Sequence, residues 1–548
     1  MAVYRNDQVD FSFGAEIGAG GYLAPVKATA DTTTEVAQVT DTVSLPGART
    51  IGVDATTNAV VGEYVQIGAT GTDGTEIRRI KSFVAGVSLT FTAPIGYYHP
   101  SGVAVQGVET TTGTAGTMTG LTLDTNTMDH MRFTPGVWES IEVPDPTMEI
   151  EPRYFLGVGA KRNYSSAYKG QQSLSGTLSN FELLNGYPLR FPLGTVATTG
   201  ESASSGSSYL SAATFKGQYF ITVASATNFA PGEYIQIGST SVAEVRKIVT
   251  VQSTTKFFLD YPLLFDHVTG AGSPVLEVVA PYTHIINEAV ELPGISWQVK
   301  NRDSSETATN DWIRRYSGGK IGQATLTAEE GGTLRMSWES APFLNMDHNQ
   351  YDDTVQTAPV NKFDASSLGV TVERPSTEPY YFSQGSITMF GVEFARVANF
   401  TININNNLEP RYFISNTAER TPTAIFEGRR EYSMTATMVL PDSTASTATT
   451  RTLFKELLAE GDYTAGFTGF DIDLVFTRGT NDTLSISIPA NVAADFTAVA
   501  SAVGGNAQGA IIRSANTSVS TENPASTEVD ILFRNMSIRV KDSEPVYP

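Results

Sequence analysis

Hydrophobic and polar residues alternate along several short stretches of the chain. In residues 400–405, Phe, Ile and Ile take every second position, with Thr and Asn between them. The same spacing occurs in residues 484–488 and 536–540, and two further alternating stretches flank Gly331-Gly332. A strand turns successive side chains to opposite faces, and a Gly-Gly pair favours a tight hairpin turn. The pattern therefore predicts antiparallel β-sheets that bury one face and leave the other polar.

Two segments depart from this alternation and space their apolar residues as on one face of a helix. The first, residues 179–186, carries Phe181, Leu183 and Leu184 and runs from a Ser, a good N-cap, to a Gly. The second, residues 450–461, begins at a Thr and also ends at a Gly. We therefore expect two β-sheet units, each with one short amphipathic helix beside it.

A repeated sequence supports two such units. Glu151–Phe155 reads Glu-Pro-Arg-Tyr-Phe and recurs unchanged as Glu409–Phe413, 258 residues later. The match continues without a gap over 28 positions, of which 10 are identical. A chance match of this length is improbable, so the sequence predicts a diverged duplication of one large domain.

A second, independent repeat predicts two small β-modules. Gly62–Gly68 recurs as Gly232–Gly238, and the similarity continues on the C-terminal side of both segments. Both modules fall inside the first large copy, next to Thr/Gly/Ser-rich stretches at 110–119 and 198–208 that we interpret as domain junctions. The predicted division is a discontinuous first domain (1–35, 109–199 and 280–340), inserted modules at 36–108 and 200–279, a linker at 341–379, and a second domain at 380–548.

The composition agrees with an all-β chain with minor α. Thr, Val, Ile and aromatic residues favour strands, and the 48 Gly and 26 Pro punctuate them. Charged residues make up only 17% of the chain and the net charge is −21. That balance argues against a general nucleic-acid binder, which needs a basic face against phosphate. The chain has no Cys, which excludes disulfides and thiolate chemistry.

No segment predicts export or membrane insertion. Met1–Asp7 lacks the apolar stretch of a signal peptide. Residues 496–512 are rich in Ala, Gly and Ser and shorter than the ~20 apolar residues of a membrane helix. We expect a soluble protein without a membrane anchor.

The histidines do not form a recognisable metal site. The five His residues lack the spacing of zinc ligands. His99 and His267 take matching positions in the two modules, so a shared ligand role is conceivable. We interpret both instead as satisfied structural side chains, on the ground that no charged residue recurs beside both.

Other polar clusters fit known sites poorly. Gly18–Gly21 lacks the Lys and the helix of a phosphate loop, and Asp124, Asn126 and Asp129 lack the spacing of a calcium loop. Neighbouring strand residues such as Glu329-Glu330 point to opposite faces and make a poor acid–base pair. The four Trp residues fit a core better than a sugar site. We therefore predict no catalytic residue, no cofactor-binding residue and no metal-binding residue.

Both large copies contain stretches of a recognisable kind. They are Tyr380–Thr388, Phe394–Leu408, Glu409–Phe413, Gly428–Glu431, Leu453–Leu458 and Arg314–Ile321. Together they resemble the tail tube (major tail) proteins of long-tailed bacteriophages. The resemblance covers the two large copies and leaves the two small modules outside it.

The resemblance implies a fold, a function and a location. The fold is two tail-tube-type β-sandwich or barrel domains, each with one flanking helix, plus the two small inserted β-modules. The function is that of a structural virion protein of the tail, made in the host cytoplasm, whose rings stack into a hollow tube. Phage DNA passes through the lumen without specific binding. The implied partners are further copies of the chain and other tail proteins such as the ruler, tail tip and terminator.

Two expectations follow if one ring is built from six tube domains. A chain with two such domains would form homotrimeric rings of pseudo-sixfold symmetry. The two modules would decorate the outside of the tube, because the lumen has no room for them.

Two other functions remain open from the residues alone. One is a receptor- or carbohydrate-binding β-rich spike or decoration protein of a virion. The other is a glycoside hydrolase, which needs two carboxylates at a defined separation in a cleft.

Overall fold

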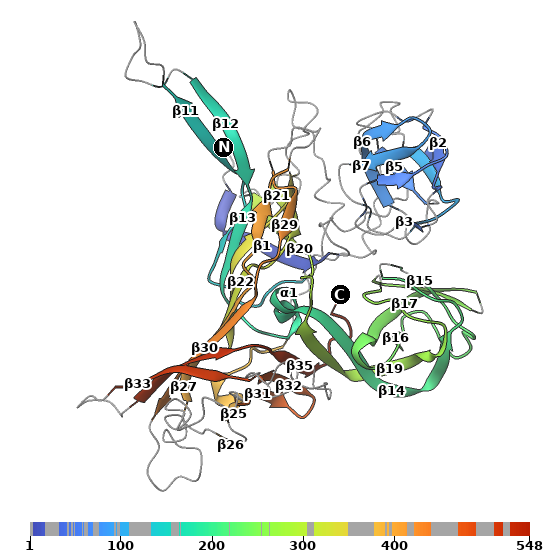
Figure 1. Cartoon of the computed structure of the whole chain (residues 1–548). Helices are drawn as coiled ribbons and strands as arrows, with labels where there is room; N and C mark the ends of the chain where they lie inside the picture. Colours follow the sequence, from blue (N-terminus) through green and yellow to red (C-terminus); the bar gives the residue numbers. More distant parts are fainter. Residues whose placement is uncertain are drawn as a thin grey trace, which may run out of the picture.

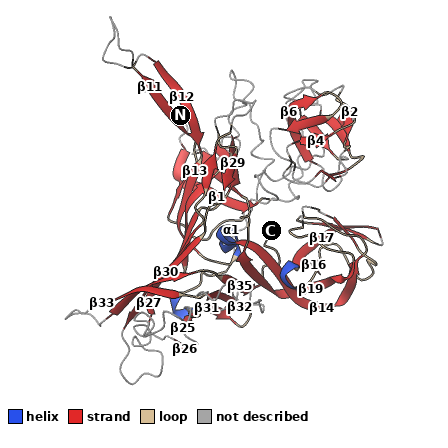
Figure 2. Ribbon diagram, viewed as in Figure 1, coloured by secondary structure: helices blue, strands red, loops and turns tan. Residues whose placement is uncertain are grey.

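The structure is a computed structural model that describes most of residues 4–547. The longer stretches that it leaves undescribed are residues 17–31, 69–75, 109–132, 155–163, 304–311, 349–376, 414–420, 440–469, 489–508 and 519–525. Nearly all the regular structure in the described part is β-strand (Figures 1 and 2). The predicted all-β class with minor α is confirmed.

An eight-stranded antiparallel sheet forms the centre of the molecule. Its order along the sheet is β10 (Ser140–Glu142), β13 (Ser175–Glu182), β23 (Arg335–Pro342), β22 (Gln323–Glu329), β27 (Val397–Asn405), β30 (Glu431–Val439), β34 (Ser526–Phe533) and β33 (Ile511–Ser518). The first four strands precede residue 343 and the last four follow residue 396. Two distant parts of the chain therefore share one continuous sheet.

Two further sheets pack against the apolar face of this central sheet. One has the order β1 (Tyr4–Ala15), β20 (Ile295–Asp303), β21 (Trp312–Gly319) and β24 (Asn345–His348). The other contains the run β25 (Gly385–Met389), β31 (Ile472–Gly479), β32 (Asp482–Ile488) and β35 (Ser537–Asp542), with β26 (Val392–Glu393) beside β25. The described core is thus a β-sandwich.

The two halves of the chain use the same strand order in both layers. In the central sheet, β10-β13-β23-β22 is followed by β27-β30-β34-β33, so each half places its fourth strand before its third. In the packing sheets, β1-β20-β21-β24 and β25-β31-β32-β35 each run in chain order.

The repeated sequence also forms two equivalent hairpins. β11 (Thr147–Arg153) pairs with β12 (Ser166–Ser173), and β28 (Glu409–Arg411) pairs with β29 (Ala424–Phe426). Glu151 lies opposite Tyr168, just as Glu409 lies opposite Phe426. The pairing register is therefore the same at positions that are 258 residues apart.

The alternating stretches form strands that bury their apolar side. Phe400, Ile402 and Ile404 are at most 3% exposed, while the residues between them lie on the open face. The residues predicted around Gly331-Gly332 form the β22–β23 hairpin, with Gly331 at a φ of 78°. Trp297 and Trp338 are fully buried and stack 6.0 Å apart between the two layers, which confirms both as core residues.

The predicted helix at 179–186 is wrong. Residues 179–182 continue β13, which is hydrogen-bonded to β10 on one side and β23 on the other. Asn180 has a φ of 48°, and the register with β23 shifts between Leu178 and Phe181. This bulge lets Leu178 and Phe181 both face the core although they are three positions apart in the sequence. A spacing of three between buried residues imitates a helical pattern.

The helix lies a few residues further along the chain. A 3-10 turn at Tyr187–Leu189 leads into the short helix α1 (Arg190–Leu193), which ends at Gly194 with a φ of 142°. Pro188 favours this start because its fixed φ suits the first turn. The second predicted helix, residues 450–461, lies outside the described residues.

Each small module has a hydrophobic core of its own. The first module's sheet has the order β2 (Thr32–Gln38), β9 (Ala104–Val108), β5 (Tyr64–Ile67), β6 (Glu76–Val84), β7 (Ser88–Phe91) and β4 (Thr50–Gly52). The second is β15 (Phe220–Thr222), β18 (Lys256–Leu259), β17 (Glu244–Ser253) and β16 (Tyr234–Ile237), which joins β19 (Gly270–Glu288).

The second module is joined to the rest of the chain by a long ribbon. β14 (Gly194–Leu210) pairs along β19, and β19 pairs with β16 near its start and with β35 near its end. Residues 198–208, interpreted from the sequence as a domain junction, are therefore part of a strand. Thr and Ser suit such a strand as well as they suit a loop.

The predicted domain limits fall inside strands at several points. The limits at 199/200 and 279/280 lie within β14 and β19, and the limit at 35/36 lies within β2. The predicted linker 341–379 begins inside β23 and includes β24, which pairs with β21. A strand that runs through a predicted limit leaves no break in composition there.

Replacing Ile402 by Ala should destabilise the protein by about 2–5 kcal/mol, because it empties a site in the core under the central sheet. Thr401→Ser, one residue away on the polar face, should cost less than about 1 kcal/mol. Urea unfolding followed by Trp fluorescence measures both. Equal effects of the two substitutions would contradict the burial of this face.

Candidate functional site

The face of the central sheet that points away from the hydrophobic core, here called the polar face, is almost entirely polar. Thr, Ser, Asn and Gln occupy most positions between the buried apolar residues of β13, β22, β27 and β30. These side chains bond to one another. The Thr325 hydroxyl donates a hydrogen bond to Glu339 at 2.7 Å and lies 3.2 Å from the side-chain amide oxygen of Asn403. Short, bonded side chains make this face smooth as well as hydrophilic.

Carboxylates predominate among the charges on this face. The acidic residues are Glu142, Glu182, Glu329, Glu339, Glu431, Glu528 and Asp530, and the basic ones on the same strands are Arg335 and Arg513. Arg513 is paired with Asp530 at 2.9 Å. The face as a whole is therefore acidic.

The sheet ends in two strands that have a neighbour on one side only among the described residues. β10 pairs with β13, and β33 pairs with β34. Ile141, in β10, and Ala515, in β33, are partly buried and pack against the core at these two ends. A free strand edge presents unpaired N–H and C=O groups and is a template for pairing with another chain.

The middle of the sheet contains a pairing that joins the two halves. β22 and β27 are antiparallel neighbours from Gln323↔Asn405 to Glu329↔Asn399. Asn406, just after β27, is buried and donates to the carbonyl oxygens of Pro192 and Ile321.

Ion pairs strengthen this internal junction. Lys320 Nζ lies 2.7 Å from Glu427 Oε1, and Arg430 Nη1 lies 3.0 Å from Glu288 Oε1. Lys320, Arg430 and Glu427 are each less than a fifth exposed, so solvent screens these pairs less than surface pairs. The two halves are held together by main-chain bonds and by charge.

A family model for phage tail tube proteins matches residues 101–525 of the chain. This range contains most of the central sheet, the internal junction and both hairpins. The chain belongs to the phage tail tube protein family. A search of curated proteins gave no match.

Family membership establishes a structural role in the virion tail. Tail tube proteins assemble with copies of themselves, together with other tail proteins, into a tube. Among the described residues, no helix has the length and hydrophobicity that crossing a membrane requires. The polar face and the open strand edges are thus features of an assembly protein.

The tail tube protein also buries a charged cluster in its second module. Glu244 lies 2.7 Å from His267 Nε2 and 2.6 Å from Arg246, and it accepts backbone N–H bonds from Leu264 and Phe265. The network holds the 264–265 loop against β17. In the first module the matching sequence positions hold Glu76, Arg78 and His99, and Arg78 and His99 are also buried. At His267 the charged neighbour is Glu244, and its trace in the sequence is the Glu that recurs at position 76.

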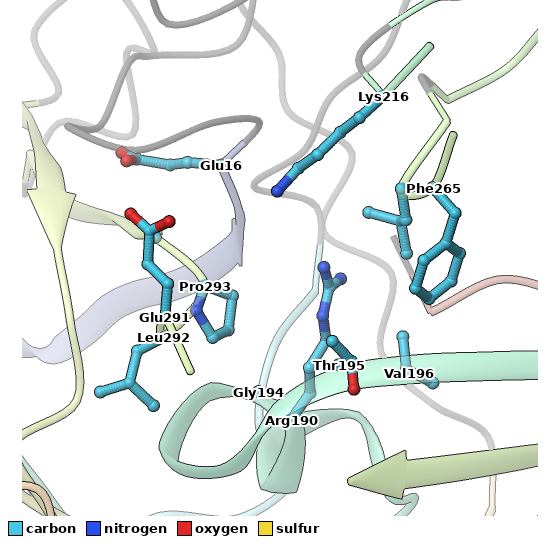
Figure 3. A pocket seen from close by; sticks show the side chains of 12 residues that line it. Glu16, Arg190, Gly194, Thr195, Val196, Lys216, Phe265, Glu291, Leu292 and Pro293 are labelled. Atoms are coloured by element: carbon cyan, nitrogen blue, oxygen red, sulfur yellow. The ribbon is translucent and has the colours of Figure 1, made fainter. Parts of the chain in front are cut away.

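A small cleft of about 90 Å³ lies where α1 and β14 face the second module (Figure 3). Arg190 and Lys216 point into it, opposite Glu16 and Glu291. Glu16 accepts hydrogen bonds from Ser296 and from the Gly318 N–H. Arg190 is 4% exposed, and desolvation lowers its pKa to about 10, so it stays charged at neutral pH. Arg190 also has a partner within the fold, since its Nη1 donates to the Tyr547 carbonyl oxygen at 3.5 Å.

The C-terminal segment of the tail tube protein locks onto the first half. The buried Tyr547 accepts a hydrogen bond from the Gly186 N–H, donates one to Asp542, and stacks on His284 at 3.7 Å. His284 in turn bonds Thr198 at 2.9 Å. Thr198, His284 and Asp542 are buried, so this Thr–His–Asp arrangement fastens strands together and has no access to a substrate. Its three members are far apart in the sequence, which explains why no motif revealed it.

The other sequence candidates contribute little to a site. Glu329 is the last residue of β22, and Glu330 follows it in the turn to β23. Gly18–Gly21 and the segment that contains Asp124, Asn126 and Asp129 lie outside the described residues. No group of three potential metal ligands occurs among the residues that the structure describes.

Buried tyrosines should make the fold sensitive to alkali. Desolvation, followed by the nearby charge of Asp542, raises the pKa of Tyr547, and burial also raises those of Tyr316, Tyr380 and Tyr432. The neutral phenol is thus favoured in the folded state. Stability is fully present below the unfolded pKa of about 10 and falls above it, by up to about 1.4 kcal/mol per pH unit for each tyrosine.

Urea midpoints measured between pH 8 and pH 11.5 test this expectation. Tyr547→Phe should make the loss of stability above pH 10 shallower, whatever its effect at pH 8. Tyr164→Phe removes an exposed phenol and should leave the slope unchanged. A slope that Tyr547→Phe does not alter would show that this phenol ionises equally in both states.

Proposed function

We propose that this tail tube protein forms rings of three chains, that each chain supplies two tube domains, and that the rings stack into a conduit for phage DNA. The observation that supports the proposal is the repeated strand order of the central sheet. The first half ends in β22, the second begins with β27, and these two strands pair. With the same strand order in both halves, β10 lies at one end of the chain's central sheet and β33 lies at the other.

The internal junction is a template for the contact between chains. If β33 of one chain pairs with β10 of the next, every domain meets its neighbour as β22 meets β27. Glu142 in β10 lies opposite Thr177, just as Thr401 in β27 lies opposite Thr435, the matching residue of the repeat. Closure of the ring would finish burying Ile141 and Ala515 and would remove both free edges. Such a head-to-tail contact closes when the rotation per chain fits the ring.

The polar face suits the lumen. An acidic wall repels the phosphate backbone, and short Thr, Ser and Asn side chains offer DNA no basic group to bind. The second module extends from the sheet that packs on the opposite, apolar side of the central sheet. That origin supports a place on the outside of the tube for this module, with a bracing role.

Cysteine pairs test the ring contact cleanly, since the natural chain has no Cys. Glu142→Cys combined with Ser518→Cys or Asn516→Cys places thiols on β10 and β33. Oxidised tubes should give covalent species that end at three chains on a denaturing gel. Glu142→Cys with Glu528→Cys, on the non-edge strand β34, is the matched control and should stay monomeric. A ladder that ends at six chains would refute the trimer, and fibres or monomers by microscopy would favour a spike.

The lumen assignment predicts no measurable affinity of assembled tubes for duplex DNA. The double variant Glu431→Lys and Glu528→Lys reverses two charges per chain on the polar face. It should gain binding that weakens steeply with added salt, because the new cations displace counterions from phosphate. Fluorescence anisotropy of a labelled duplex at several salt concentrations measures both proteins. Strong salt-dependent binding by the natural tubes would contradict a passive conduit.

A further inference from the structure

The second repeat hairpin contacts the first hairpin through one tyrosine. Tyr412 follows β28 directly, and its hydroxyl donates a hydrogen bond to the carbonyl oxygen of Gln172 in β12, at 3.3 Å. Burial raises the pKa of Tyr412. Because β12 belongs to the first half and β28 to the second, this bond is part of the internal junction.

The first hairpin has the same tyrosine without the same surroundings. Tyr154 is the counterpart of Tyr412 in the repeated Glu-Pro-Arg-Tyr-Phe sequence, and the two hairpins pair in the same register. Tyr154 is nevertheless 64% exposed. The hairpin that carries it projects from the body of the protein (Figure 1), and Ile150, Tyr164 and Tyr168 are also more than half exposed. An isolated two-stranded ribbon with this much exposed apolar surface is marginal in water and is typical of an interface.

We propose that Tyr154 makes across the chain boundary the contact that Tyr412 makes within the chain. Its hydroxyl would donate to the carbonyl oxygen of Arg430 in the neighbouring copy whose β33 pairs with its own β10. Arg430 is the counterpart of Gln172 at the same 258-residue offset. The partner is thus a second copy of this chain in the same ring. The inference rests on the ring order of the proposed function and assigns one residue contact within it.

The direction of the contact follows from the strand order. Within the chain, a residue of the second half reaches back to the half whose β22 pairs with its β27. At the boundary between chains, the same arrangement makes a residue of the first half contact the neighbouring chain that supplies β33. A contact with a chain in the ring above or below would not repeat the internal geometry.

The tyrosine bond is a part of the junction that both boundaries can share. The internal ion pairs use Glu427 and Arg430, whose counterparts in the first half are Lys169 and Gln172. Lys169 carries the opposite charge to Glu427, and Gln172 is uncharged. Neither of the two internal ion pairs can therefore form with these counterparts at the boundary between chains. A backbone carbonyl does not depend on the side chain and is present at both boundaries. Tyr154 therefore contributes a larger share of the hairpin contact between chains than Tyr412 does within one.

A photoreactive phenylalanine analogue in place of Tyr154 identifies the partner in assembled tubes. After irradiation, mass spectrometry should find it joined to residues 428–432 of another chain. The same analogue at Tyr164, equally exposed on the same hairpin, should not give that peptide. Joining to any other segment, or to its own chain, in tubes that are otherwise normal would overturn the inference. Failure to form rings of three would instead count against the proposed function.

Assembly measurements provide a second test. Tyr154→Phe should raise the protein concentration needed for tube formation by about 2- to 10-fold, as expected for one lost hydrogen bond per chain. Tyr164→Phe should change it less than 2-fold, and circular dichroism should show both variants folded. An unchanged threshold for Tyr154→Phe would refute the hydrogen bond.

Discussion

Main-chain pairing between β22 and β27 is the interaction on which the remaining structure depends. It converts two four-stranded units into one sheet, so the two halves bury their apolar faces in a common core. Backbone pairing carries little side-chain specificity, and the register must be fixed by other means. Here Asn406 bonds two carbonyl groups of the first half, and the pairs Lys320–Glu427 and Arg430–Glu288 hold the flanks. Specificity is thus added around a generic sheet contact.

This division explains how the proposed boundary between chains can differ from the boundary inside the chain. The boundary inside the chain forms at high effective concentration, since both strands belong to one molecule. It includes partly buried charges, and Glu427 and Arg430 lack equivalents of the same charge in the first half. A boundary without these pairs is weaker, which suits a contact that forms only when chains meet in order.

The sequence predicted the sheets well and the boundaries between segments poorly. Strict alternation at Phe400, Ile402 and Ile404 reported a strand with one buried face, and burial confirmed it. The prediction of a helix at 179–186 was wrong because the bulge at Asn180 shifts the alternation of β13 by one residue. In the sequence, such a bulge is visible only as an interruption of the alternating pattern. The charged network around Glu244 was visible as a repeated Glu-x-Arg, while the cluster of Thr198, His284 and Asp542 depends on contacts between distant strands. The local pattern of hydrophobic residues shows which face of a strand is buried. It does not show which strands contact one another.

The ribbon of β14 and β19 has a mechanical consequence. β19 contains 19 residues, which corresponds to about 60 Å of extended strand, and it belongs to the second module at one end and to the sheet of β35 at the other. Hydrogen bonds between strands lie perpendicular to the strand axis, so a pull along the ribbon loads them in shear and distributes the force over many bonds at once. A pull across the ribbon would load them one after another. The ribbon that carries the module is therefore stiff against forces along its strands and bends more easily under forces across them.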